Sequence, residues 1–115
     1  MERALIVRKE WLDLIFSGQK TWEMRSARTN IRGKIGLIEA GSGMIVGETE
    51  IIDCFSNCFS LAELLEHKDK HCVSEVDLLQ KWPIAWVLRR SFRWSHPKPV
   101  KVPKGAMIWV KLVDN

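Results

Sequence analysis

The segment 44–55 is the feature that most constrains the fold. It reads as one long β-strand that is interrupted by Gly47. A glycine inside a strand is typical of a β-bulge, where one extra residue bends the strand. A small closed barrel requires strands that bend in this way. The segment therefore favours a small barrel-type sheet.

The rest of the chain divides into short elements of both kinds. Five further segments show the alternating or continuous apolar pattern of strands: 3–8, 20–26, 34–40, 84–90 and 106–113. Helical spacing or capping sequences predict three short helices at 9–17, 61–67 and 74–80, and 91–99 reads as irregular. Because strands are too many and helices too few for a doubly wound sheet, we predict an α+β fold. It is a small mixed β-barrel of about six strands with about three flanking helices.

Length and composition fit one soluble domain. The 115 residues predict a single domain over residues 1–115, and the apolar fraction of 46% with a charged fraction of 28% argues against disorder. No apolar run is long enough for a membrane helix or a secretory signal. The odd number of cysteines, three, favours free thiols in a reducing compartment. We therefore expect a cytoplasmic protein. A monomer is favoured, but the sequence leaves the oligomeric state open.

Two thiols and a His-Cys pair raise the question of a metal site. Cys54 and Cys58 are separated by three residues, but His71 and Cys72 are adjacent and do not easily point at one ion from regular structure. We therefore expect no metal. We interpret His67 and His71 as capping or surface groups. No phosphate-binding glycine loop, GxSxG or HExxH motif is present, and we expect no cofactor.

The segment 18–25 carries the densest candidate chemistry. Gly18 ends a helix, and the strand that follows places Glu23 and Arg25 on one face, with Lys20 at its start. Together these side chains could bind a phosphate or polarise a carbonyl. The alternative interpretation is an exposed strand face with a weak salt bridge. On either interpretation, we expect replacing Lys20 or Glu23 with alanine to leave stability nearly intact.

Further basic residues extend this candidate surface. They are Arg8 and Lys9 after the first strand, Arg28 and Arg32 beyond the charged segment, and Arg89, Arg90 and Arg93 beside Phe92 and Trp94. Basic residues interleaved with aromatic ones can follow a phosphate backbone and stack on bases. A solvated loop anchored by its two aromatic residues explains the last group equally well. The net charge of +4 permits a polyanionic partner without requiring one, and whether residues 92–98 cover a cleft stays open.

Two apolar segments near the C-terminus predict buried tryptophans. Trp86 lies in the middle of the predicted strand 84–90, and Trp109 lies in the continuous apolar run of the last strand. A continuous run of this kind is consistent with burial on both faces of the sheet. We therefore expect both indoles to belong to the core.

The run Gly18-x-Lys20-x-x-Glu23-x-Arg25, which follows a short strand and an amphipathic helix, resembles the signature of the ASCH domain. This family is related to the PUA domains of RNA-modifying proteins. The segments 85–88 and 105–109 also resemble its closing strands. The resemblance implies a β-barrel surrounded by helices, with a cleft near the signature that binds RNA or a nucleobase.

The resemblance also implies a possible enzymatic role. One branch resembles small amidohydrolases that deacetylate acetylated cytidine with a lysine, a threonine and a glutamate, and other members are linked to RNA cleavage. By this analogy Lys20 would activate or stabilise charge. That branch has its threonine where Glu23 stands here, which puts this mechanism in doubt, although Glu23 could act as a general base on water.

The expected function is therefore RNA or nucleobase binding. A hydrolase acting on a modified nucleoside or on RNA is the alternative. The candidate catalytic residues are Lys20 and Glu23. The candidate residues for binding RNA or a nucleotide-like ligand are Lys20, Glu23, Arg25, Arg8, Lys9, Arg28 and Arg93.

Overall fold

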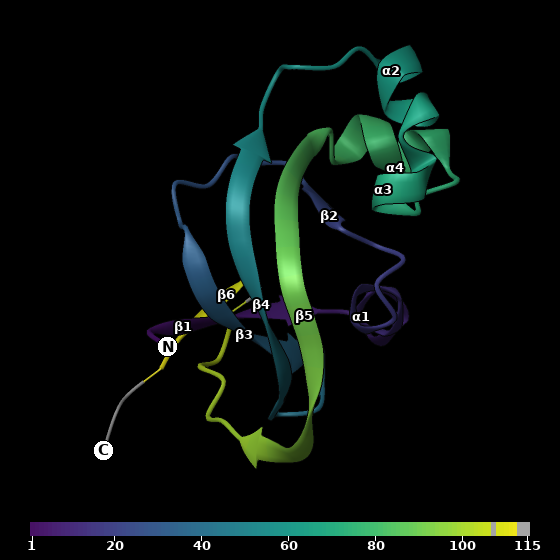
Figure 1. The fold of residues 1–115 in the computed structure, drawn as a ribbon. Coiled ribbons are helices and arrows are strands. Elements are labelled where there is room, and N and C mark those ends of the chain that lie inside the picture. Colours follow the sequence, from purple (N-terminus) through teal and green to yellow (C-terminus); the bar gives the residue numbers. More distant parts are fainter. Residues whose placement is uncertain (107, 113–115) are drawn as a thin grey trace.

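The computed structural model describes residues 1–106 and 108–112, which form six strands and four short helices (Figure 1). The strands are β1 (Arg3–Val7), β2 (Trp22–Arg25), β3 (Gly33–Glu39), β4 (Met44–Phe55), β5 (Ile84–Pro99) and β6 (Trp109–Lys111). The helices are α1 (Lys9–Phe16), α2 (Leu61–Glu66), α3 (Lys68–His71) and α4 (Val76–Lys81). The predicted α+β class and the six strands are confirmed, whereas the helices number four instead of three.

All six strands belong to one curled sheet in the order β2-β5-β4-β3-β1-β6. The β1–β3 pair is parallel, and every other neighbouring pair is antiparallel. The sheet is a half-barrel, because β2 and β6 are its two edges and do not pair with each other. Helices α2–α4 gather at one end of the long β4–β5 ribbon, and α1 lies beside β5 (Figure 1).

Gly47 marks the bend in β4, and the predicted bulge is confirmed. Against β3, one extra residue of β4, Val46, lies between the pairs Ile38–Ile45 and Leu37–Gly47, and the register of β4 against β5 also shifts at this point. A Cβ at Gly47 would collide with the carbonyl oxygen of Phe92 and would lie 2.6 Å from the Phe16 ring. Glycine is therefore needed here so that α1 can place Phe16 directly against the bent strand.

The helix ends follow the sequence signals only in part. Gly18 has a φ of +85°, as a residue that terminates α1 requires. Ser60 and Glu63 form the predicted capping box at the start of α2. Helix α3, only four residues long, was not predicted, and α4 begins at Val76 with Glu75 as its N-cap instead of at Ser74. None of the helices in the described residues has the length and apolarity needed to cross a membrane.

The prediction that residues 91–99 are irregular is wrong. β5 continues through them to Pro99 and pairs with the first half of β4. Two features hid the strand: Arg90 has a φ of +52°, and the β4–β5 register shifts three times, so the side-chain alternation is broken. Pro97 and Pro99 are compatible with the strand because β2 pairs only with the segment Ile84–Val87, which leaves the rest of β5 with one open edge.

The predicted burial is confirmed for one of the two tryptophans, Trp86. Trp86 is buried, with 3% of its surface exposed, in the cluster that fills the concave side of the sheet with Leu5, Leu12 and Leu37. Trp109 is only half-buried and stacks on Trp86, with ring centroids 5.7 Å apart. Ile108 is 42% exposed, so the last strand is not buried on both faces. Two residues of the predicted strand 106–113, Met107 and Val113, lie outside the described residues.

We predict that Gly47→Ala destabilises the protein by about 1–3 kcal/mol, because the added methyl group overpacks against a backbone carbonyl and an aromatic ring. Gly36→Ala is the matched control in the neighbouring strand, since its Cβ would meet Ala4 Cβ at 3.1 Å. Urea unfolding measures both, and the larger loss is expected at Gly47. An equal or smaller loss at Gly47 would contradict the role given to this residue.

Candidate functional site

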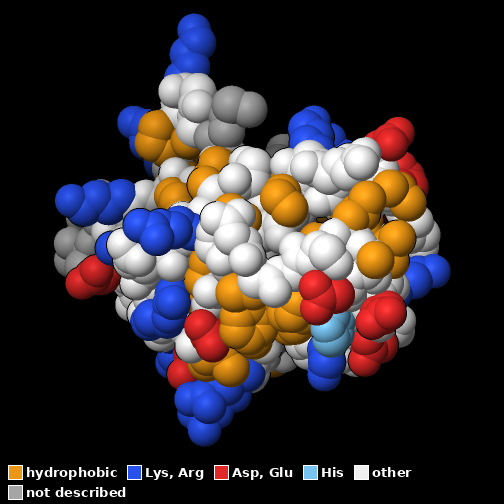
Figure 2. Space-filling model, turned by 90° about the horizontal axis from the view of Figure 1, so that it is seen from above, with side chains coloured by type: hydrophobic (Ala, Val, Ile, Leu, Met, Phe, Trp, Pro, Cys, Tyr) orange, Lys and Arg blue, Asp and Glu red, His pale blue; other side chains and the backbone are white. Residues whose placement is uncertain are grey.

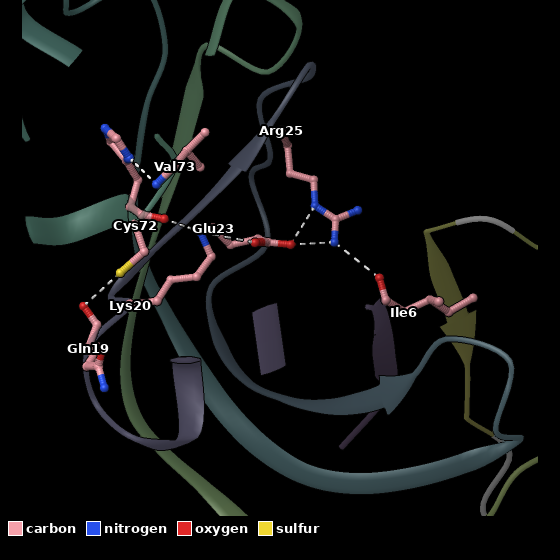
Figure 3. A network of polar contacts seen from close by, with 8 residues as sticks. Ile6, Gln19, Lys20, Glu23, Arg25, Cys72 and Val73 are labelled. Atoms are coloured by element: carbon pink, nitrogen blue, oxygen red, sulfur yellow. Dashed lines mark hydrogen bonds and ion pairs between the residues drawn. The ribbon is translucent and has the colours of Figure 1, made fainter. Parts of the chain in front are cut away.

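Lys20 lies in the connection between α1 and β2, and its side chain turns into the protein. Only 2% of its surface is exposed. The Nζ donates a 2.6 Å hydrogen bond to the carbonyl oxygen of His71 and lies 3.6 Å from Glu23 Oε1 (Figure 3). It also sits 4.9 Å from the centroid of the Trp11 ring. The ammonium group is therefore surrounded by acceptors that belong to the protein itself.

Glu23 is held between two cations. Its Oε1 faces Lys20, and its Oε2 accepts hydrogen bonds from Arg25 Nη2 at 2.7 Å and Nε at 3.1 Å (Figure 3). Arg25 Nη2 also donates to the carbonyl oxygen of Ile6 at 3.1 Å. Because Ile6 belongs to β1 and Arg25 to β2, this guanidinium group bridges two strands that have no backbone pairing with each other.

A pocket of about 420 Å³ opens along this seam between β1 and β2. Its volume lies within the range of small-molecule sites. Glu23, Arg25 and Arg8 supply charged groups, and Trp11 and Trp82 supply aromatic surface. The remaining lining residues are Ile6, Val7, Met24, Ser26, Ala40, Val73 and Ile108. The recess is thus mostly apolar, with a carboxylate and a guanidinium group adjacent on one wall.

The burial of Lys20, behind the pocket wall formed by Glu23 and Arg25, determines its pKa. Loss of solvent lowers the pKa of Lys20 below its usual value, and the nearby Glu23 carboxylate partly opposes this shift. Lys20 does not line the pocket. Its ammonium group orients the Glu23 carboxylate from behind, while Arg25 does so from the side. The arrangement can present a fixed acceptor beside guanidinium donors to a flat, partly apolar ligand.

His71 supports the site from the helical end, and the interpretation as a surface group is wrong. The side chain is fully buried. Its Nε2 donates to the carbonyl oxygen of Leu64 at 2.6 Å, and its Nδ1 accepts from the backbone N–H of Val73 at 2.9 Å. These partners require the neutral ring with its proton on Nε2. Burial lowers the pKa of His71, which favours the same neutral form.

The structure separates the remaining candidate residues. Arg8 lines the pocket and is exposed. Lys9 and Arg93 each lie 2.9 Å from an oxygen of Asp13 on α1, and Arg93 also stacks over the Phe16 ring. Arg28 is exposed in the connection between β2 and β3. Lys9, Arg28 and Arg93 do not line the pocket.

Two aromatic pocket residues were missed from the sequence. Trp11 was assigned only to the apolar stripe of a helix, and Trp82 received no role because it precedes the helix-ending Pro83. Trp11 lies in the helix that leads directly into the charged segment, which is a signal that the sequence offers, whereas Trp82 is far from that segment in the sequence and has no such signal. Phe92, by contrast, is 50% exposed and lies outside the pocket, and no residue of the 92–98 stretch lines it.

The cysteine and histidine side chains can be assessed as a metal site in the described part of the chain. In residues 1–106 and 108–112, no group of three or more His, Cys, Asp or Glu side chains is arranged to hold a metal ion. Cys54, Cys58 and Cys72 are free thiols. The Sγ of Cys72 lies 3.4 Å from the carbonyl oxygen of Gln19, next to the buried Lys20 (Figure 3).

Comparisons with known proteins agree with the fold. The sequence model of the ASCH domain matches residues 5–98. The ASCH structure from Zymomonas mobilis is 15% identical, covering 97% of this chain and 87% of that one, with a TM-score of 0.72. A serine-to-alanine mutant of that protein gives a TM-score of 0.75 at 15% identity, with coverages of 97% and 88%. The search of curated proteins found no match.

The burial of Lys20 and Glu23 revises the expectation that alanine leaves stability nearly intact. We predict that Glu23→Ala costs about 3–5 kcal/mol, because it leaves the buried Lys20 ammonium without its counter-ion. Lys20→Met is expected to cost less, since it removes the buried charge, keeps most of the volume and leaves Glu23 paired with Arg25.

Denaturant unfolding of both variants tests this order. Glu50→Ala is the matched control, because it breaks a carboxylate–arginine pair on the exposed side of the sheet and is expected to cost at most about 1 kcal/mol. A wild-type unfolding midpoint for Glu23→Ala would show that the buried pair does not stabilise the fold.

We also predict that His71 titrates below its ordinary pKa of 6.5. Because the folded-state pKa is lowered, the stability from neutral His71 is fully present above about pH 6.5 and is lost as the pH falls through the folded pKa. NMR of the His71 imidazole resonances measures this pKa. A value at or above 6.5 would contradict the neutral, doubly bonded ring.

Proposed function

Because the chain belongs to the ASCH domain family, we propose that it binds RNA by taking one unpaired nucleobase into the pocket between β1 and β2. The family is PUA-like and is proposed to bind RNA. The observation that carries the proposal is the pocket itself, which combines aromatic walls with a fixed carboxylate and guanidinium group.

The aromatic walls suit a base. Trp11 and Trp82 both contribute to the lining, and indole rings stack on any nucleobase. Each such stacking interaction is worth about 1–3 kcal/mol in single-strand recognition. A duplex keeps its bases stacked on one another, so a recess of this kind favours unpaired or looped-out bases.

The polar wall suits the edge of the base. Arg25 uses Nε and Nη2 in its hydrogen bonds within the described residues, which leaves the N–H groups of Nη1 for a ligand. Among residues 1–106 and 108–112, the polar contact of Glu23 Oε1 is the 3.6 Å one with Lys20, so this oxygen keeps acceptor capacity. A donor next to an acceptor is the pattern that base edges present. Arg8, exposed at the pocket, is suited to a phosphate beside the bound base.

Hydrolysis has no comparable support. Lys20 donates to the His71 carbonyl oxygen and does not line the pocket, so it has no direct access to a ligand there. Thr21, the threonine inside the signature, does not line it either. We therefore assign Lys20 to the positioning of Glu23 and propose binding as the function.

We predict that Trp82→Ala weakens the binding of nucleoside monophosphates by about 5- to 150-fold, which corresponds to the removal of one stacking interaction. Arg8→Ala is expected to weaken the binding of monophosphates but not of the corresponding nucleosides, because it removes the phosphate contact only. Isothermal titration calorimetry with the four ribonucleotides measures these effects.

The matched controls lie outside the pocket. Phe92→Ala removes a half-exposed aromatic ring and Arg28→Ala an exposed arginine, and neither is expected to change nucleotide affinity. Wild-type affinity for Trp82→Ala would contradict the proposal. Mass spectrometry of the same mixtures, with acetylated cytidine added, gives the second check: consumption of a nucleoside by the wild type but not by Lys20→Met would replace binding with hydrolysis.

A further inference from the structure

Positive charge is concentrated in the C-terminal part of the chain. Residues 84–112 contain seven lysines and arginines and no aspartate or glutamate, whereas the rest of the chain has eleven basic and fourteen acidic residues. In the view along the end that holds α2, Lys and Arg side chains predominate on the left, and acidic side chains are more frequent on the right, where the helices α2–α4 lie (Figures 1 and 2). The modest net charge of the chain therefore conceals a strongly basic C-terminal segment.

Six of these seven basic residues fall into two groups, and the seventh, Lys111, lies in β6. Arg89 and Arg90 share Glu50, and Arg93 shares Asp13 with Lys9, so each of these arginines has a carboxylate partner within the fold. The exposed lysines Lys98, Lys101 and Lys104 form no ion pair with any residue in 1–106 or 108–112. We call residues 98–104 the basic arm. Its three lysines can therefore meet a polyanionic partner without first breaking an ion pair to a described residue.

The basic arm is tied to two elements that border the pocket. The backbone N–H of Val100 donates to the carbonyl oxygen of Gly43, in the turn that begins beside the pocket residue Ala40. At its other end the chain returns from β5 towards β6 and reaches Ile108, which also lines the pocket (Figure 1). Both ends of the arm are therefore connected, through short stretches of chain, to residues that line the pocket.

The backbone of the arm is suited to a polyanion more than to a peptide strand. Pro97, Pro99 and Pro103 fix their φ angles, so that less conformational entropy is lost on binding. Pro97 and Pro99 also lie on the part of β5 that has one open edge, where they provide no N–H for pairing with a further strand. Strand addition at this edge is disfavoured, whereas side-chain contacts to phosphates are not.

We propose that the basic arm binds the phosphates of an RNA strand whose base occupies the pocket, so that the ligand is single-stranded RNA and not a free nucleoside. This inference rests on the proposed function of the pocket. It assigns selection of the base to the pocket and the greater part of the affinity to Lys98, Lys101 and Lys104.

The test compares two double variants with the same change in charge. Lys101→Gln/Lys104→Gln removes two lysines of the arm, and Lys68→Gln/Lys70→Gln removes two exposed lysines of α3. Affinity for a nucleoside monophosphate and for an oligoribonucleotide of about ten residues is measured at several salt concentrations. All four lysines are exposed, so wild-type melting curves are expected for both proteins.

We predict that the oligoribonucleotide binds the wild type more tightly than the monophosphate does. The arm variant should lower the slope of log affinity against log salt by about 1.4, because each phosphate that a lysine no longer neutralises reduces the slope by about 0.7. Its affinity for the monophosphate should be unchanged, and the α3 variant should behave as the wild type towards both ligands.

Failure of this inference is distinguishable from failure of the proposed function. An unchanged salt slope for the arm variant, or equal slopes for the two double variants, would overturn the inference, while the pocket would stand if Trp82→Ala still weakens monophosphate binding. If Trp82→Ala leaves both ligands unaffected and the arm variant alone weakens the oligoribonucleotide, the pocket proposal fails. The arm would then bind RNA without a base in the pocket, and this result would also overturn the proposed connection between the arm and the pocket.

Discussion

The carboxylate of Glu23, held between Lys20 and Arg25, is the interaction on which the rest of the site depends. Through Lys20 it is connected to the carbonyl oxygen of His71, and so to the helices α2 and α3. Through Arg25 it is connected to the carbonyl oxygen of Ile6 on β1. Three charged groups thus join the helical end, the edge strand β2 and the far side of the curled sheet. Removing these three charged groups from water costs free energy. The cost is offset because each charge has a partner of opposite sign.

The pocket lies where a side-chain bridge, and not backbone pairing, connects β2 to β1. β2 pairs with β5 on one side only, and β1 pairs with β3 and β6. Arg25 spans the gap between β2 and β1 with one guanidinium group, which occupies much less space than a continuous strand pairing. The remaining room is bordered by Trp11 and Trp82. The open seam between β1 and β2 and the mostly apolar recess with its one charged wall therefore belong to the same arrangement.

The sequence predicted the parts of the fold whose signals are local. Gly47 indicated a bulge, and Ser60 with Glu63 indicated a helix start, because each depends on residues within one turn or strand. The sequence-based predictions were wrong where burial depends on elements that are distant in the sequence. The two-residue alternation of β2 suggested one exposed face, but helices cover the Trp22 side and the seam encloses the Glu23 side. Burial of a charged strand face cannot be deduced from alternation alone.

The division of charge between the pocket and the basic arm fits the way in which RNA is read. Phosphate contacts position a strand and supply affinity, whereas contacts to bases supply selectivity. In the pocket the Glu23 carboxylate is compensated by Lys20 and Arg25, so a neutral base meets oriented hydrogen-bonding groups without a large excess of charge. The lysines of the arm have no such partners among the described residues. Under the proposed function, the compensated charges orient one base and the uncompensated charges hold the strand that carries it.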